Sequence, residues 1–431
     1  MTLVTSDGSC EQTERLTNPW LVLMLLTACY ALSGADRQLV AVLAEPLRQE
    51  FGLSDTQLGL LSGFMFALFY TAFGVPLAWL ADRANRVKII AAACFTWSLF
   101  TAATGLSTAF SHLAIARAGV AIGEAGASPP AYALIADYFP PQRRGTMLGI
   151  YSVGLPFGIA VGTALGGLVA AHFGWRAAFF AMAVPGVVLA FIIAVVIRHP
   201  RRGRLDASPI PVSDRAPPLI DTVRQFVAKP VLWSTTLAGC LSSMSSYAVM
   251  VWMPAFLMRE RGMSLEEIGT SYSLVTGAAM VTGMLAGGRL LDVLGKRRPR
   301  AGAVIPGIAY LLTAPLMFAA IWTDDWHVTL AMLVLPFALM MMWLPPVLVT
   351  LHSETRAAER ATISAIFLLL AGIVGNGGGP ALVGALSDGL AASHPGRSLA
   401  WALTCIVPVF ILAGIVHLAS ALAPRTDRSS G

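Results

Sequence analysis

Four charged residues lie inside apolar stretches of this sequence, where no loop accounts for them. Asp36 and Arg37 are neighbours in the first apolar stretch, and Arg117 and Glu124 share the fourth. A charged side chain at the centre of a bilayer costs roughly 2.5 to 3.5 kcal/mol, so such residues usually pair, face a cavity and mark a path for an ion or a solute. The two carboxylates could bind and release a proton, and the two guanidinium groups could pair with an anion.

Membrane-spanning helices are the elements that must position these residues. Hydrophobic residues make up 56% of the 431 residues, charged residues only 12%, and the mean hydropathy is +0.71. Many apolar stretches approach the roughly 20 residues that a spanning helix needs. We therefore expect an all-α membrane protein with twelve transmembrane helices, at 20–44, 57–81, 88–108, 112–136, 145–170, 175–197, 231–257, 267–291, 301–322, 327–351, 361–387 and 398–421.

The basic residues predict the orientation of these helices, because Lys and Arg accumulate in cytoplasmic loops. If both termini are cytoplasmic, most of the 29 basic residues fall on the cytoplasmic side. The opposite loops then hold only Arg48, Arg176, Arg259, Arg261 and Arg397. The net charge of +6 therefore reflects membrane topology, and we expect no nucleic-acid partner. The five cysteines are scattered, which implies neither a disulfide framework nor a metal site.

One polar interruption divides the chain. Residues 200–230 are basic and rich in proline, as expected of a cytoplasmic linker between an N-terminal six-helix bundle at 1–199 and a C-terminal one at 231–431. The halves echo each other weakly: Asp82 and Arg86 after the second helix correspond to Asp292 and Lys296 after the eighth. Two similar, pseudo-symmetric halves are what a rocking transporter needs, because its substrate site lies between them and opens alternately to each side.

Several motifs resemble those of known transporter families. Residues 74–86, Gly-Val-Pro-Leu-Ala-Trp-Leu-Ala-Asp-Arg-Ala-Asn-Arg, resemble the loop motif between helices two and three of the major facilitator superfamily, and the resemblance covers essentially the whole chain. Within that superfamily the chain looks most like the spinster group, which is linked to lysolipid and sphingolipid export, at 36–38, 51–59, 117–125, 134–140 and 174–176. The anion:cation symporter family, whose members take organic acids such as sugar acids, is similar in the same Asp-Arg, Arg and Glu residues.

The depths of the four charged residues suggest proton coupling. If the first helix runs outward, Asp36 and Arg37 lie about 10 to 12 Å below its outer end. Arg117 then shares this level, and Glu124 faces the same side at about mid-depth. We expect Asp36 to be the main protonation site and Arg37, Arg117 and Glu124 to form a charge network that rearranges when it is protonated. Glu124 could instead be the principal proton site, and the whole set could be a structural salt-bridge network.

A second group of charged residues lies at the predicted cytoplasmic rim. The family resemblance implies that Asp82, Arg83 and Arg86, with Asp292 in the second half, form a gate that closes the inner side of the seam between the halves. A helix end attracts opposite charge, which is how such a gate would work. The alternative is a solvated turn that only obeys the positive-inside rule.

Glycines spaced by four residues mark the fifth helix. Gly154, Gly158 and Gly162, with Pro156 among them, could form a kinked hinge that governs the direction of transport, as similar patterns do in exporters of the resembled superfamily. Small residues at this spacing also let two helices pack closely, so packing alone is the alternative.

The second half predicts the class of substrate. It carries almost no charge within its helices, but it offers serines beside Tyr247, the polar Asn376, and a Met340 to Met342 run next to Trp343. A charged wall opposite a soft apolar wall suits a solute with one polar head and a hydrophobic body. An amphipathic or lipid-like organic solute is therefore our first expectation, and proton symport of sugar acids or aromatic acids is the second.

Other classes of protein fit the sequence less well. The seven histidines are dispersed and no phosphate loop is present, so we expect neither an enzyme nor a cofactor or metal site, and a transporter-like sensor stays as a different-class alternative. The expected partners are the substrate, protons and membrane lipids. We expect a monomer in the inner membrane of a bacterium.

Overall fold

The computed structural model describes residues 16–81, 83–201, 205, 219–295, 298, 300–355 and 360–423, and every regular element in these ranges is a helix. Helices are what an apolar chain forms in a bilayer, because each backbone N–H and C=O must find its partner within the segment. Within the described ranges, 11 helices are long and apolar enough to cross a membrane. The predicted all-α membrane fold is therefore confirmed.

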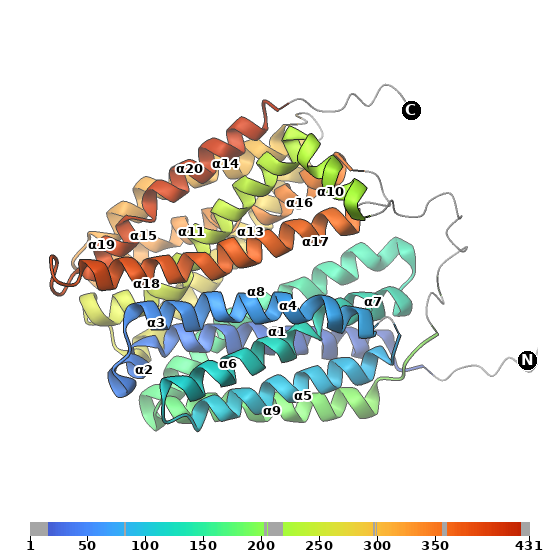
Figure 1. Cartoon of the computed structure of the whole chain (residues 1–431), viewed down its shortest axis with the longest axis horizontal. Coiled ribbons are helices and arrows are strands. Elements are labelled where there is room, and N and C mark those ends of the chain that lie inside the picture. The colour runs from blue at the N-terminus through green and yellow to red at the C-terminus, as the bar shows by residue number, and fades with distance from the viewer. Residues whose placement is uncertain are drawn as a thin grey trace, which may run out of the picture.

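The first half of the chain supplies ten helical elements (Figure 1). They are α1 (Pro19–Val42), α2 (Ala44–Phe51), α3 (Asp55–Gly59), the π-helical turn η1 (Leu60–Phe64), α4 (Met65–Ala81), α5 (Arg86–Gly105), α6 (Phe110–Ala125), α7 (Ser128–Tyr138), α8 (Pro141–Phe173) and α9 (Trp175–Val196).

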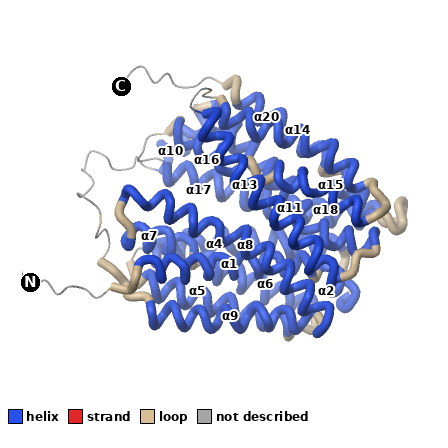
Figure 2. Tube along the Cα trace, turned by 180° about the vertical axis from the view of Figure 1, so that it is seen from behind, coloured by secondary structure: helices blue, strands red, loops and turns tan. Residues whose placement is uncertain are grey.

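The second half forms a second layer of helices against the first (Figure 1, Figure 2). Its elements are α10 (Leu219–Ala228), α11 (Pro230–Arg261), α12 (Leu265–Glu267), the π-helical turn η3 (Ile268–Tyr272), α13 (Ser273–Gly295), α14 (Ala301–Ile321), α15 (Trp326–Leu339), α16 (Leu344–Ser353), α17 (Arg360–Leu370), the π-helical turn η5 (Ala371–Gly377), α18 (Gly378–Leu390), α19 (Ser398–Thr404) and α20 (Val407–Ser420). α10 falls within the stretch predicted as a linker, and it packs on α11 and α17.

The tenth predicted transmembrane helix is divided into α15 and α16 and the twelfth into α19 and α20, and the fourth is interrupted as well. The fourth is divided into α6 and α7, with Gly126 and Ala127 between them. Pro129 and Pro130 begin α7, where their missing N–H groups cost nothing, but they could not continue α6 without losing hydrogen bonds. The apolar pattern at 112–136 was predicted correctly, whereas the break inside it was not.

The two halves meet most closely at the end of the molecule that lies away from the start of α1 and the end of α20 (Figure 1). There α3 and η1 pack on α18, and α8 packs on α12, η3 and α13. Added Cβ atoms at Gly59 and Gly384 would lie only 2.3 Å from the Pro380 carbonyl oxygen and 2.2 Å from the Asp55 carbonyl oxygen. At the opposite end, α7, α10, α16 and α17 make their extensive contacts within their own half. The seam is therefore closed at the remote end.

The glycine ladder of α8 packs against α1. A Cβ atom added at Gly158 would lie 1.8 Å from the Ala31 carbonyl oxygen, and one at Gly162 would lie 2.5 Å from Ala35. An added Cβ at Gly154 would likewise meet the Thr27 carbonyl oxygen at 2.7 Å. α8 continues as one helix through Pro156. This packing holds α1, and with it Asp36 and Arg37, at a fixed depth in the bundle.

Candidate functional site

Asp36 and Arg117 form an ion pair inside the first half. The Arg117 Nη1 donates to Asp36 Oδ2 at 3.1 Å, and Thr101 on α5 donates its hydroxyl to Asp36 Oδ1 at 2.6 Å. The Arg117 side chain is only 1% exposed. Both oxygens of this carboxylate are thus engaged, and the pair joins α1, α5 and α6 without access to solvent.

Arg37 and Glu124 form a second ion pair beside the first. The Arg37 Nε donates to Glu124 Oε2 at 2.7 Å, and Ser33 donates its hydroxyl to the same oxygen at 2.6 Å. Glu124 Oε1 is buried and has no hydrogen-bond partner among the described residues. The Glu124 residue also lines a water-sized cavity within the first half, together with Tyr30 and Tyr151. Glu124 Oε1 therefore accepts no hydrogen bond from the described residues.

Arg37 is the member of this network that reaches toward the second half. Its side chain is 20% exposed, and beyond the Nε bond its guanidinium makes no other hydrogen bond with the residues that the structure describes. The guanidinium lies over the rings of Phe66 and Tyr70, with its Cζ 4.8 Å and 4.9 Å from their centroids. Tyr247 on α11 lies close enough to interact with it electrostatically. Two terminal nitrogens of Arg37 can therefore receive an anionic group.

The arrangement follows from local helix geometry. Side chains of an α-helix tilt toward its N-terminus, so Arg37 reaches back along α1 toward Glu124 of α6. Asp36 of α1 meets Arg117, which also lies on α6. Removing one partner from a buried ion pair leaves an uncompensated charge, which costs about 3 to 5 kcal/mol. The four charges therefore hold α1, α5 and α6 together only while both pairs are complete.

Asn376 was predicted to belong to the same site, but the structure does not bring it to the charge network. Its Oδ1 accepts the Ser243 hydroxyl at 2.7 Å, and Ser243 also donates to the Ala371 carbonyl oxygen at 3.2 Å. Both bonds lie within the second half, between α11 and the π-helical turn η5. Asn376 thus fastens this irregular turn to α11.

Among the described residues, no ion pair or hydrogen bond across the seam involves Arg83, Arg86 or Asp292. Arg86 pairs with Asp137 of α7, within the first half. Arg83 lies over the Trp79 ring, with its Cζ 4.0 Å from the ring centroid, and Asp292 is exposed on α13. Asp82 lies outside the described residues. Their gating role stays a prediction, as does the hinge role of the glycines in α8.

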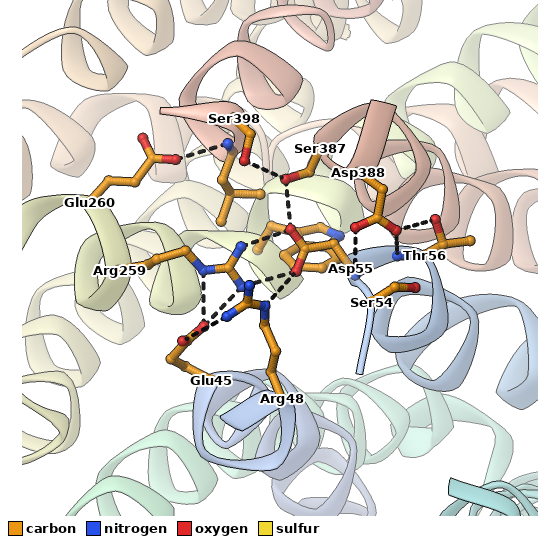
Figure 3. A network of polar contacts seen from close by, with 12 residues as sticks. Glu45, Arg48, Ser54, Asp55, Thr56, Arg259, Glu260, Ser387, Asp388 and Ser398 are labelled. Carbon is orange, nitrogen blue, oxygen red and sulfur yellow. Dashed lines mark hydrogen bonds and ion pairs between the residues drawn. The ribbon is translucent and has the colours of Figure 1, made fainter. Parts of the chain in front are cut away.

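An inter-half network at the closed end was missed by the sequence reasoning (Figure 3). Arg259 of α11 donates to Asp55 Oδ2 at 2.7 Å and to Asp55 Oδ1 at 3.0 Å, and also to Glu45 Oε2 at 2.9 Å. Asp388 of α18 accepts the backbone N–H groups of Asp55 at 2.9 Å and of Thr56 at 2.8 Å. A carboxylate from one half thus caps the first turn of α3 in the other.

The sequence contained only a weak signal for this network. Asp55 follows Ser54, which together with Gln57 forms a capping box at the start of α3, so Asp55 looked like an ordinary first-turn acid. Arg259 looked like a loop cation near the end of an apolar stretch. Their partnership depends on how two halves of the chain, far apart in sequence, dock on each other.

Within the described residues, no group of three or more His, Cys, Asp or Glu side chains could hold a metal ion. Two helical layers with buried ion pairs between transmembrane helices and a seam closed at one end are the architecture of a membrane transporter.

The sequence comparisons identify the family. Residues 26–380 match the family described as the Major Facilitator Superfamily, and the chain belongs to it. An MFS-type efflux pump of Mycolicibacterium smegmatis is 35% identical over 404 residues, which cover 93% of this chain and 92% of that protein. The cis,cis-muconate transport protein of Acinetobacter baylyi is 30% identical over 287 residues, covering 65% of this chain and 68% of that protein.

A solved structure agrees with the fold over nearly its whole length. It is a bacterial homolog of the human lysosomal transporter Spinster in an inward-facing and unoccupied conformation, with a TM-score of 0.88 and 29% identity over 95% of this chain and 99% of that one. The predicted superfamily and the spinster resemblance are confirmed. The family consists of transporters, which confirms that the chain is not an enzyme.

Proposed function

We propose that the chain is a proton-coupled secondary transporter that works by alternating access. The observation that carries this proposal is the position of Arg37, which is bound to Glu124 through Nε and accessible through its remaining nitrogens. One guanidinium thus joins a carboxylate that can be protonated to a position where an anion can bind. Protonation at one end changes the affinity at the other, which is the linkage that coupled transport requires.

The contacts favour Glu124 as the group that takes up a proton first in this conformation. A carboxylic acid needs one oxygen free to carry its hydrogen, and Glu124 Oε1 has no protein donor to displace. Asp36 accepts hydrogen bonds on both oxygens, so its protonation would break one of them. Asp36, the main proton site of the sequence argument, then exchanges its proton at a later step, when Arg117 moves.

An amphipathic anion is the substrate class that this site fits best. The charged head would pair with Arg37, and Phe66, Tyr70 and Tyr247 would surround it with aromatic faces. The apolar body would lie against the uncharged second half. The similarity to a spinster homolog supports a lipid-like solute. Organic-anion symport is the second candidate, because Arg37 would bind a carboxylate equally well and a muconate transport protein is among the relatives.

The closed seam supports a proposal for the state of the transport cycle. Basic residues gather at the end where α1 begins, and by the positive-inside rule we propose that this end and both termini lie in the cytoplasm, with the chain in a bacterial inner membrane. The remote end, which the Arg259 network closes, is then the outer gate, and the chain is in an inward-facing state like the similar solved structure. Asp82, Arg83, Arg86 and Asp292 would close the cytoplasmic end in the opposite state. We propose that a single chain carries out this cycle.

Proton flux in liposomes tests the proposal. Purified protein would be reconstituted with an internal pH dye, and proton movement would be followed after addition of either lysophospholipids and sphingoid lipids or sugar acids and aromatic acids. We expect flux with the lipid panel that is lost in Glu124→Gln and Asp36→Asn. Flux with the acid panel would favour organic-anion symport instead.

The control is Glu266→Gln. It neutralises an exposed acid on α12, at the remote end of the molecule, and this variant should transport like the unmodified chain. Full proton dependence in both Glu124→Gln and Asp36→Asn would refute the coupling role. Retained binding of a substrate without any flux would favour a sensor.

A further inference from the structure

A second small pocket lies in the seam between the halves, next to the charge network but separate from it. Its walls come from α1 and α8 on one side and from α11, η3, α13 and α15 on the other. Most of the lining is apolar, including Met250, Met280 and Phe337. No charged side chain is among the lining residues. Because both halves form its walls, the pocket must change shape whenever the halves rock.

Two polar side chains in the lining of this pocket, one from each half, have no hydrogen-bond partner among the described residues. Gln38 of α1 is 3% exposed and Tyr272 of η3 is 2% exposed, and both line the pocket. No hydrogen bond joins the Gln38 amide or the Tyr272 hydroxyl to another residue that the structure describes. Because they line the pocket, both groups are available to hydrogen-bond a molecule that enters it.

The other hydroxyls of the pocket are already satisfied. Thr163 donates to the Ile159 carbonyl oxygen at 2.9 Å, and Thr276 donates to the Tyr272 carbonyl oxygen at 2.6 Å. Each bond lies within the residue's own helix. The hydrogen-bonding capacity that remains therefore belongs to one amide from the first half and one phenol from the second.

The pocket and the site around Arg37 are both bordered by α1 and α11. Gln38 follows Arg37 on α1, and Met250 lies one helical turn beyond Tyr247 on α11. A solute whose anionic head pairs with Arg37 would therefore place its next atoms between Gln38 and Tyr272. An amide and a phenol recognise an uncharged group that both donates and accepts, such as a hydroxyl, and the apolar walls exclude a second charge.

We propose that Gln38 and Tyr272 form a substrate subsite that binds a hydroxyl group next to the anionic head of an amphipathic solute. This inference rests on the proposed function, because it takes Arg37 as the site of the head group. It goes further by selecting among solutes: amphipathic anions that carry a hydroxyl beside the head group are favoured over those that lack one, and over sugar acids, whose further polar groups would meet Met and Phe side chains.

A matched pair of probes tests the subsite. 1-O-tetradecylglycerol 3-phosphate and its 2-deoxy analogue differ by one hydroxyl, and their dissociation constants would be measured with purified protein in lipid nanodiscs. We expect the unmodified chain to bind the hydroxylated probe about three- to tenfold more tightly, as one net hydrogen bond provides. Gln38→Leu should abolish this preference, and Tyr272→Phe should reduce it.

The control is Gln142→Leu, the same substitution at an exposed position of α8, which should keep the full preference. Tyr272→Phe retains the aromatic ring, so its preference for the hydroxylated probe tests the subsite if Gln38→Leu fails to fold. An equal preference in the unmodified chain and both variants, or no preference in any of them, would overturn the proposal and leave the pocket as a site for water only. Failure of the proposed function would look different. Proton flux would then be absent in liposomes, although the protein still preferred the hydroxylated probe.

Discussion

Replacing Arg259 with Gln should open the closed end of the molecule. This guanidinium is the only charge that the second half places between Asp55 and Glu45 among the described ion pairs, and its side chain is 18% exposed. Exposed ion pairs contribute about 0.2 to 1 kcal/mol, and breaking a fully buried pair costs about 3 to 5 kcal/mol. Because Arg259 is partly buried, its ion pairs should stabilise the closed seam by about 2 kcal/mol, a value between these limits. The ratio of molecules with a closed remote end to molecules with an open one should therefore fall roughly 30-fold in the variant, at about 1.36 kcal/mol for each factor of ten.

Distances between spin labels would measure this change. Ala171 of α8 and Ala392, which follows α18, are exposed positions in the two halves at the closed end, and each would be changed to Cys in a background with Cys10 and Cys405 replaced by Ser. We expect a short distance in the unmodified chain and a larger share of long distances in Arg259→Gln.

Arg397→Gln is the matched control for this experiment. It removes an arginine from the same end of the molecule, but Arg397 pairs at 3.3 Å with Asp324 of its own half. Its distance distribution should therefore match that of the unmodified chain. The same distribution in Arg259→Gln as in the control would refute the reasoning that this network closes the seam.

Three further outcomes follow from the structure. Arg117→Met leaves a buried carboxylate without its partner and should destabilise the fold by about 3 to 5 kcal/mol, seen as a lower thermal unfolding temperature in detergent. Gly158→Ala places a methyl group against a backbone carbonyl of α1 and should cost about 1 to 3 kcal/mol, whereas Gly149→Ala, with open space around it, should not. Hydrogen bonds from Arg176 and Trp175 lower the pKa of Glu50, so its stabilisation is present above the ordinary carboxyl pKa and is lost as the pH falls through the lowered one. Glu50→Gln should thus destabilise the chain by less than about 1 kcal/mol at pH 7, and not at all in acid.

Much of the fold could be predicted because the bilayer makes local sequence decisive. A long apolar stretch has few alternatives to a spanning helix, so eleven of the twelve predicted stretches correspond to candidate membrane helices. The exception, at 112–136, shows the limit of this reasoning. Hydropathy does not register that Pro129 and Pro130 must start a new helix, and the resulting break helps to form the cavity beside Glu124.

The charges of the candidate site were identifiable from sequence for the same reason. Asp36, Arg37, Arg117 and Glu124 stand out because an ion in a lipid-facing stretch has a cost that must be met by a partner. The sequence predicted that they form one network, and the structure pairs Asp36 with Arg117 and Arg37 with Glu124. The sequence could not assign the partners, since each acid had two arginines within reach at similar depth.

The sequence by itself thus determined the helical membrane fold, the superfamily and the charged residues of the first half. The tertiary structure alone decided that Arg37 faces the second half while Arg117 is sealed, that Asn376 serves η5, and that Arg259 joins Asp55 across the seam. The physical reason is the range of the interactions. Burial in lipid acts on each helix separately, whereas hydrogen bonds and ion pairs act over about 3 Å and depend on how the two halves dock.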